Sequence, residues 1–384
     1  MSRIDELIAE LCPEGVEFRT VGQSAAVVPT VRGIKRTDYG LGTNIPVVDQ
    51  GQALVAGHTD DEASALPKGE YIVFGDHTRA VKWVDFKFAP GADGTKVLAP
   101  VQGLLGRYLY HSLSSLKIPS RGYNRHWTVL RELRIPVPPL EVQRDIVRVL
   151  DAFTELEAEL EAELEARRRQ YAHYRDSLLT FPEGRVRWIP MGEVGEFIRG
   201  RRFVRTDMVD TGISAIHYGE IYTHYGVSTS NTLSHVRSDL APQLRHAQSG
   251  DVVIAAVGET VEDVGKAVAW LGDDSVAIHD DCFAYRHSMN PKYVSYYLQT
   301  EAFHSQKSRY VARAKVKRLS SADLAKITIP VPPLDEQARI VAILDSFDAL
   351  VNDLSIGLPA ELAARRKQYE HYRDRLLTFK EATA

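Results

Sequence analysis

The stretch Ile135-Pro136-Val137-Pro138-Pro139-Leu140 occurs a second time as Ile329-Pro330-Val331-Pro332-Pro333-Leu334. Identical residues continue downstream at the same spacing: Gln143/Gln337, Ile146/Ile340, Val147/Val341, Leu150/Leu344, Asp151/Asp345 and Phe153/Phe347. The match resumes at 168–176 against 366–374, and both copies finish in Leu-Leu-Thr-Phe. This self-similarity identifies 135–181 and 329–384 as duplicates, the second with four extra residues in its middle.

A weaker echo relates the regions that surround the duplicates. Pro-Glu-Gly occurs at 13–15 and at 182–184, each time before a short strand-like run and then Gly22 or Gly192. The N-terminus therefore resembles the end of a third, truncated copy. The resulting layout is circular, with two variable regions that alternate with two conserved helical segments, as a pseudo-twofold molecule requires.

The duplicated segments are predicted to be long helices. Prolines keep the preceding chain extended, and acidic residues then suit a first helical turn. Apolar residues follow at heptad-like spacing, from Ile146 to Leu178 and from Ile340 to Leu376. About forty residues make a rod of about 60 Å, too long to bury its apolar stripe on one compact domain. We therefore predict that the two helices pack antiparallel on each other; the alternative is two separate amphipathic helices, each covering its own domain.

The four extra residues of the second copy resemble a coiled-coil stutter, which keeps the apolar seam facing its partner. Gly357 and Pro359 lie at this insertion, so we predict a kink or break there.

Length and composition narrow the class of protein. The 384 residues are enough for two or three domains, and 44% apolar with 26% charged residues excludes a disordered or collagen-like chain. No apolar run is long enough to span a membrane, and the acidic start argues against a secretory signal. Cys12 and Cys282 cannot build a disulfide framework, so we expect reduced thiols and a cytoplasmic protein.

The variable regions alternate short β-like runs with turns, for example at 71–74, 81–84, 251–257 and 267–271, and a helix is predicted over 291–305. The predicted fold class is α+β: two globular domains of mixed α/β structure joined by two long antiparallel coiled-coil helices. The expected domains are 1–134 (with a short N-terminal helix), 135–181, 182–328 and 329–384.

Charge is distributed unevenly along the chain, whose net charge is −4. The acidity lies on the helical segments, above all in the glutamates of 155–165, which form a solvated face or a docking surface for a basic partner. The variable regions carry three basic clusters with interleaved aromatic residues, around 121–134, 197–205 and 309–318. Such clusters are solvated surface or a nucleic-acid surface, and three in two duplicated regions favour nucleic acid.

No catalytic constellation is recognisable. The sequence lacks a G-x-x-x-x-G-K-[ST] phosphate loop, and its histidines are too widely spaced for a compact zinc motif. Asp273-Asp274 and Asp280-Asp281 are expected to be solvated loop residues rather than cation ligands. The loop Gly75-Asp76-His77-Thr78-Arg79 has no evident nucleophile and suits a polar reading or positioning role. We expect no catalytic residue, no metal site and no cofactor in this chain.

The repeat motifs, over essentially the whole chain, resemble the specificity subunit of Type I restriction–modification systems. Phe74–Arg79 and Ala215–Tyr222 also resemble segments of its target recognition domains, here 15–134 and 183–327. The resemblance implies a split DNA target, one half for each domain, with the helices fixing the spacer. The candidate DNA-binding residues are Asp76, His77, Thr78, Arg79, Arg121, Asn124, Arg125, Arg199, Arg201, Arg202, Tyr218, Arg313, Lys315 and Lys317.

The resemblance also implies partners: double-stranded DNA, two methyltransferase subunits docked on the conserved helices, and motor–nuclease subunits, with no membrane. The candidate partner-binding residues are Gln143, Phe153, Gln170, Tyr174, Gln337, Phe347, Gln368 and Tyr372. S-adenosylmethionine, ATP and Mg²⁺ would belong to the partner subunits. Three alternatives stay open: a specificity subunit of a methylation-only system, a coiled-coil scaffold without DNA contact, and a self-contained modification enzyme.

Overall fold

The computed structural model describes residues 3–30, 32–120, 122, 124–311, 317–353 and 355–382. The chain forms two compact units. Unit 1 combines Met1–Glu159 with Leu362–Ala384, and unit 2 is the continuous stretch Leu160–Glu361. Each unit therefore contains one variable region together with part of both duplicated helical segments.

The described residues of unit 1 form three small sheets. The largest has the order β2 (Ala25–Val27), β8 (Thr95–Pro100), β5 (Tyr71–Gly75) and β6 (Val81–Val84), with antiparallel neighbours. A second has the order β4 (Gly57–Thr59), β3 (Ile45–Val48) and β7 (Ala89–Pro90), and the third pairs β1 (Glu17–Thr20) with β9 (Arg134–Val137). Helix α3 (Gly106–Ser115) packs its Leu109 and Leu113 on the first sheet, against buried Ile72, Phe74 and Leu98.

Unit 2 repeats this construction with other sequence. Its first sheet has the order β11 (Gly195–Arg199), β21 (Cys282–His287), β17 (Val252–Ala255), β19 (Ala267–Trp270) and β14 (Ser228–Thr229). The second runs β12 (Met208–Val209), β15 (Ser234–Val236), β13 (Ile213–Ile216), β20 (Val276–Ile278) and β16 (His246–Ala247). The strand pair β10 (Arg187–Pro190) and β23 (Thr328–Val331) corresponds to β1 and β9.

Strand direction shows that the second sheets of the two units are built alike. Strand β3 lies antiparallel to β4 and parallel to β7, and β13 lies antiparallel to β15 and parallel to β20. Helix α8 (Pro291–Tyr297) occupies the place of α3, because Tyr293 donates to the carbonyl of Pro330 as Tyr108 donates to that of Pro136. The predicted helix over 291–305 is interrupted, since Thr300 caps a separate helix α9 (Glu301–Lys307).

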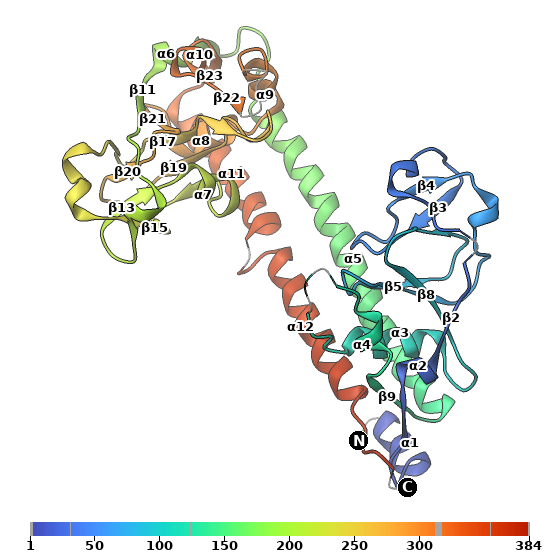
Figure 1. Ribbon diagram of the computed structural model, residues 1–384. Helices are drawn as coiled ribbons and strands as arrows, with labels where there is room; N and C mark the ends of the chain where they lie inside the picture. The colour runs from blue at the N-terminus through green and yellow to red at the C-terminus, as the bar shows by residue number, and fades with distance from the viewer. Residues whose placement is uncertain are drawn as a thin grey trace. The chain divides into compact units, whose positions relative to one another are not determined.

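The duplicated segments form α5 (Leu140–Leu178), α11 (Leu334–Asn352) and α12 (Leu358–Leu376) (Figure 1). In unit 1 the Phe153 ring stacks on Tyr372 with centroids 5.3 Å apart. In unit 2 the equivalent residues exchange places, and Tyr174 stacks on Phe347 at 5.4 Å. A second contact in each unit gives the direction: Glu157 binds Arg366 in unit 1, and Tyr171 binds Asp348 in unit 2. In both units the partner residue number falls as that of α5 rises, so the predicted antiparallel pairing is confirmed within each unit.

The helix of the second copy is interrupted at the four-residue insertion, as predicted from the sequence. Helix α11 ends at Asn352 and α12 begins at Leu358, whereas α5 is continuous over 39 residues (Figure 1). Between them the Asp353 carboxylate accepts hydrogen bonds from the backbone N–H groups of Ser355 at 2.7 Å and Ile356 at 3.3 Å. These bonds offer the backbone an alternative to the helix.

The ends of the chain meet in unit 1, as the circular layout requires. Val16 donates to the carbonyl of Lys380 and accepts from the N–H of Ala382. The Arg134 guanidinium makes a two-pronged ion pair with Glu381. The expected N-terminal helix is α1 (Arg3–Leu11), whose Ile4 belongs to the same apolar cluster as Ile146 of α5. Among the described residues, no helix is long and apolar enough to cross a membrane.

Candidate nucleic-acid interface

Each variable domain is fixed to its helix by one buried glutamine. The Gln143 amide, fully buried, donates to the carbonyls of Gly103 (2.9 Å) and Pro138 (2.8 Å) and accepts from the N–H of Leu105 (2.9 Å). Gln337 is 1% exposed, donates to Pro332 and accepts from the N–H of Asn290. Burial removes both glutamines from the surface that a partner subunit can reach, so their role is to position the domains.

An aspartate eight residues after this glutamine makes a second contact between helix and domain in each unit. Asp151 accepts from the Nε of Arg107 at 3.0 Å and lies 2.8 Å from Nε2 of His111. Burial lowers the pKa of His111, so the neutral ring donates from Nε2 to the carboxylate. Burial opposes ionisation of Asp151, but the hydrogen bonds from Arg107 and His111 outweigh it and lower its pKa. In unit 2, Asp345 binds Lys292 and Tyr296, each at 2.8 Å.

The domain surface of unit 1 has a hollow of about 470 Å³, which we call hollow 1. Four segments meet there: the turn Arg36–Asp38, the residues after β3, the loop after β5, and the turn after β7. Its lining consists of Lys35, Arg36, Tyr39, Asp49, Gln50, Gly51, Thr78, Ala92 and Asp93. Lys35 and Arg36 are exposed, so cationic side chains stand at the opening.

The loop predicted to read DNA has a divided role. Asp76 is 2% exposed and its carboxylate accepts from the N–H of Trp127 at 2.7 Å, so it anchors the following segment. The N–H of His77 donates to the side-chain oxygen of Gln50 at 3.3 Å, and the Thr78 hydroxyl donates to the Gln50 carbonyl. Arg79 is exposed, has φ of 64° and binds the carbonyl of Ile118. Asp76 is thus placed to support the loop, whereas Thr78 and Arg79 reach the surface.

Unit 2 has a hollow of about 630 Å³, hollow 2, on the corresponding elements. It brings together the predicted residues Arg199, Arg202 and Tyr218, and it adds Arg205 and Arg318. Arg201 lies exposed on the same segment but does not line the hollow. The complete lining is Arg199, Arg202, Phe203, Val204, Arg205, Met208, His217, Tyr218, His279, Asp280, Asp281 and Arg318.

Aromatic rings form the floor of hollow 2. The His217 ring lies 4.4 Å from Tyr218 and 4.6 Å from His279, and Phe203 meets His279 edge-on at 4.9 Å. Burial lowers the pKa of His217, and its Nδ1 accepts from the N–H of Gly219 at 3.2 Å. The neutral ring therefore carries its proton on Nε2, which makes that nitrogen a hydrogen-bond donor.

The cluster His279, Asp280 and Asp281 has the atoms of a cation site, all within 4.8 Å of one another. Its surroundings argue against that use. The His279 Nε2 lies 3.1 Å from the carbonyl of Phe203 and Nδ1 accepts from the N–H of Asp281, while Arg318 lies 3.6 Å from the Asp281 carboxylate. Protein groups therefore already occupy both ring nitrogens and balance one carboxylate.

The remaining candidates lie in segments that dock on loops after β5 and β17, or outside the described residues. Asn124 and Arg125 are exposed in the segment that docks on the β5 loop, where the N–H of His126 donates to Asp76. Lys317 lies in β22 (Lys317–Arg318), which pairs with β18 (Val257–Gly258) after β17. Both basic segments thus dock on equivalent loops. The candidates Arg121, Arg313 and Lys315 lie outside the described residues.

The partner-binding candidates on the helices fall into two classes. The rings of Phe153, Tyr372, Tyr174 and Phe347 pack in the helix pairs, although Tyr174 stays 42% exposed. Gln368 is exposed and Gln170 partly so. A partner can reach these last positions, in contrast to Gln143 and Gln337.

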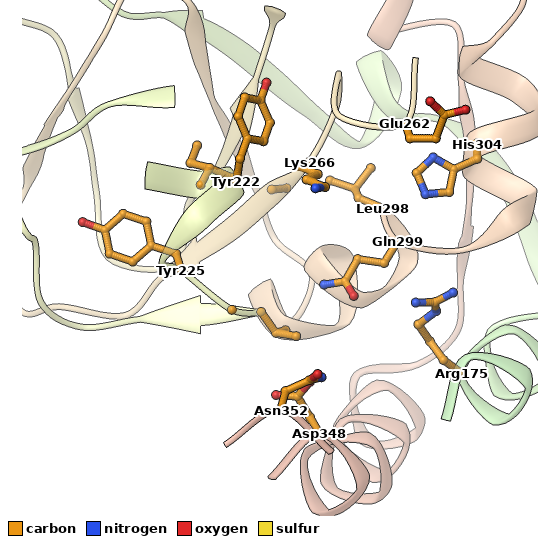
Figure 2. A pocket seen from close by; sticks show the side chains of 14 residues that line it. Arg175, Tyr222, Tyr225, Glu262, Lys266, Leu298, Gln299, His304, Asp348 and Asn352 are labelled. Carbon is orange, nitrogen blue, oxygen red and sulfur yellow. The ribbon is translucent and has the colours of Figure 1, made fainter. Parts of the chain in front are cut away.

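A further hollow of about 390 Å³ lies in unit 2 where α9 and α7 (Tyr218–Thr223) approach α5 and α11 (Figure 2). Figure 2 shows Arg175 of α5 and His304 of α9 on one side, and Asp348 and Asn352 of α11 on another. Burial lowers the pKa of His304 to about 4, so its ring is neutral near pH 7. The lining mixes both charge signs, without the surplus of cations that hollow 2 presents.

Sequence reasoning missed Lys35, Arg36 and Gln50. A signal was present, because Arg36-Thr37-Asp38 and Arg205-Thr206-Asp207 repeat the same tripeptide, each in a 3₁₀ turn. Three residues are too few to recognise as a repeat before the neighbouring strands have been matched.

Comparisons with known proteins agree with this construction. A sequence model described as the Type I restriction modification DNA specificity domain matches residues 16–166 and 189–364. The specificity subunit of the Type I restriction enzyme EcoR124I/EcoR124II of Escherichia coli is 32% identical to the chain and covers 91% of each. A candidate Type I specificity subunit of Haemophilus influenzae is 28% identical over 95% of this chain and 96% of that protein.

Two solved structures share the fold. One, described as the basis of complex assembly and conformational transition of the type I R-M system, has a TM-score of 0.58 at 21% identity, covering 95% of this chain and 98% of that one. The other, the S subunit of a Type I system from M. genitalium, has a TM-score of 0.52 at 15% identity, covering 94% and 96%.

Proposed function

Because the chain belongs to the family of Type I restriction–modification specificity subunits, we propose that it recognises a bipartite DNA target, one half with each variable domain. The observation that carries the proposal is the pair of hollows on equivalent elements of the two units, each with exposed cationic side chains in its lining. Arginine and lysine at the openings suit phosphates, and polar or aromatic floors suit base edges. The domains 1–134 and 182–328 are the proposed readers.

We further propose that the helical segments 135–181 and 329–384 set the spacing of the half-sites and carry the partner subunits. Two methyltransferase subunits would dock on helix positions that a partner can reach, such as Gln170 and Gln368, and motor–nuclease subunits would join for restriction. S-adenosylmethionine, ATP and Mg²⁺ would be bound by those partners. The chain itself would act in the cytoplasm as a recognition subunit, without a catalytic step of its own.

The test is the binding of duplex DNA by the full chain at several salt concentrations. Contacts from Lys and Arg to phosphates release counterions, so affinity should fall steeply as salt rises, and one bipartite sequence should bind more tightly than unrelated DNA. A scaffold without DNA contact would show no salt-dependent binding, which would refute the proposal. Methylation by the purified chain alone would instead identify a self-contained enzyme.

A further inference from the structure

Identical residues recur around the two hollows, and one equivalent pair, Arg36 and Arg205, lines both of them. Arg36-Thr37-Asp38 corresponds to Arg205-Thr206-Asp207, with Arg36 and Arg205 exposed in both. Gly51 and Gly219 likewise follow the equivalent strands β3 and β13 at the same distance. We call these shared residues the frame, because the two domains have them in common although the rest of their sequences differs.

The register of the parallel strand pairs identifies which residues differ inside that frame. Val48 pairs with Pro90 at the end of β3, and Ile216 pairs with Ile278 at the end of β13. The two residues that follow each strand line the hollows: Asp49 and Gln50 in unit 1, His217 and Tyr218 in unit 2. At the same structural position, one hollow presents an amide and the other a phenol.

Both half-sites of a duplex have the same sugar–phosphate backbone and differ only in their bases. A residue that is identical in the two hollows suits the backbone, and a residue that differs suits the bases. Resting on the proposed function, we infer that Gln50 and Tyr218 are specificity-determining residues, each for one half-site. Arg36 and Arg205 bind the phosphates that flank the bases read.

The surroundings of Gln50 fix the polarity of its contact. Its amide oxygen accepts from the backbone N–H of His77 at 3.3 Å, which requires an oxygen at that end. A Cβ on Gly94 would lie 2.4 Å from this oxygen, so the absence of a side chain there leaves room for the amide. The Nε2 end is left as the donor toward the hollow. A donor selects the acceptors of the major groove, such as guanine O6 and N7 or thymine O4.

The experiment uses the full chain together with the partner subunits that co-purify with it. Duplexes with randomised positions are selected by binding and sequenced. Gln50→Glu replaces the donor by an acceptor while one carboxylate oxygen still faces His77. We expect the preference to change at one base pair of one half-site, toward a base with an exocyclic amino group, cytosine above all. The other half-site should stay as in the wild type, which also shows that the variant is folded.

Three variants complete the design. Gln102→Glu makes the same change at an exposed position outside the hollow and should alter no base. Arg36→Ala should lower affinity roughly tenfold for all sequences without changing the consensus. Gln50→Ala should relax the same single base pair that Gln50→Glu changes.

An unchanged consensus in both half-sites for Gln50→Glu would overturn the inference while leaving the proposed function intact. So would the loss of all binding in both Gln50 variants, because base reading predicts an effect at one position. A wild-type complex that selects no bipartite sequence would refute the proposed function itself, and the inference with it.

Discussion

Replacing Gln143 by methionine should destabilise unit 1 and leave unit 2 unchanged. Methionine has nearly the same length but neither donates nor accepts as an amide does. The change removes three hydrogen bonds between α5 and the 103–105 turn or Pro138, each 2.8–2.9 Å long. At about 1 kcal/mol net for each bond, the free energy of unfolding should fall by about 3 kcal/mol. Leaving the buried backbone partners unsatisfied makes this the lower end of the range.

The chain offers matched controls for this change. Gln337→Met removes two such bonds in unit 2, so the loss should be about 2 kcal/mol and should appear there. Gln368→Met makes the same substitution at an exposed site of α12 and should stay within about 0.5 kcal/mol.

A protein with two units need not unfold in a single two-state transition, so one transition does not give the free energy of unfolding of each unit. Hydrogen exchange followed peptide by peptide, at increasing urea, assigns a free energy of opening to each unit. We expect the peptides of unit 1 to lose protection in Gln143→Met while those of 182–328 keep it. A loss no larger than in Gln368→Met would refute the reasoning that the buried amide joins the domain to its helix.

Other predictions follow from exposed and buried charges. Arg125→Ala should weaken duplex binding similarly for all sequences and reduce the slope of log affinity against log salt by about one; an unchanged slope in the titrations would contradict it. Burial lowers the pKa of Lys307 to about 8, so between pH 8 and 10 the unfolded chain binds more protons and stability should rise with pH, by at most about 1.4 kcal/mol per unit. Lys307→Met should remove this rise of stability with pH, as measured by urea denaturation of unit 2. Replacement of the exposed Glu155 and Glu159 by lysine should reduce the amount of methyltransferase partner that co-purifies with the chain. An amount equal to that of the wild type would exclude the acidic face as the docking surface.

The architecture could be predicted from the sequence because its signals are repeated and local. The duplicated motif indicated two equivalent helical segments, and Gly357 with Pro359 indicated the break between α11 and α12. Prolines and heptads act over a few residues, so one sequence suffices to detect them.

The composition of the hollows could not be predicted in the same way. Lys35, Gln50, Thr78 and Asp93 come from four separate segments that only the sheet register brings together. Polar character alone also does not distinguish a surface residue from a buried joint. Asp76 looked like a contact residue and Gln143 like a docking residue, yet both are enclosed by their own domain.

The division of the chain into a continuous and a discontinuous unit has a consequence for biosynthesis. Unit 2 ends at Glu361, so all of its residues are synthesised before the strand-like tail around Glu381 that unit 1 needs. The unit that begins the chain is therefore the last to be completed after it leaves the ribosome. A nascent protein that stops before Glu381 would lack the Arg134–Glu381 ion pair and would have a complete unit 2 but an incomplete unit 1.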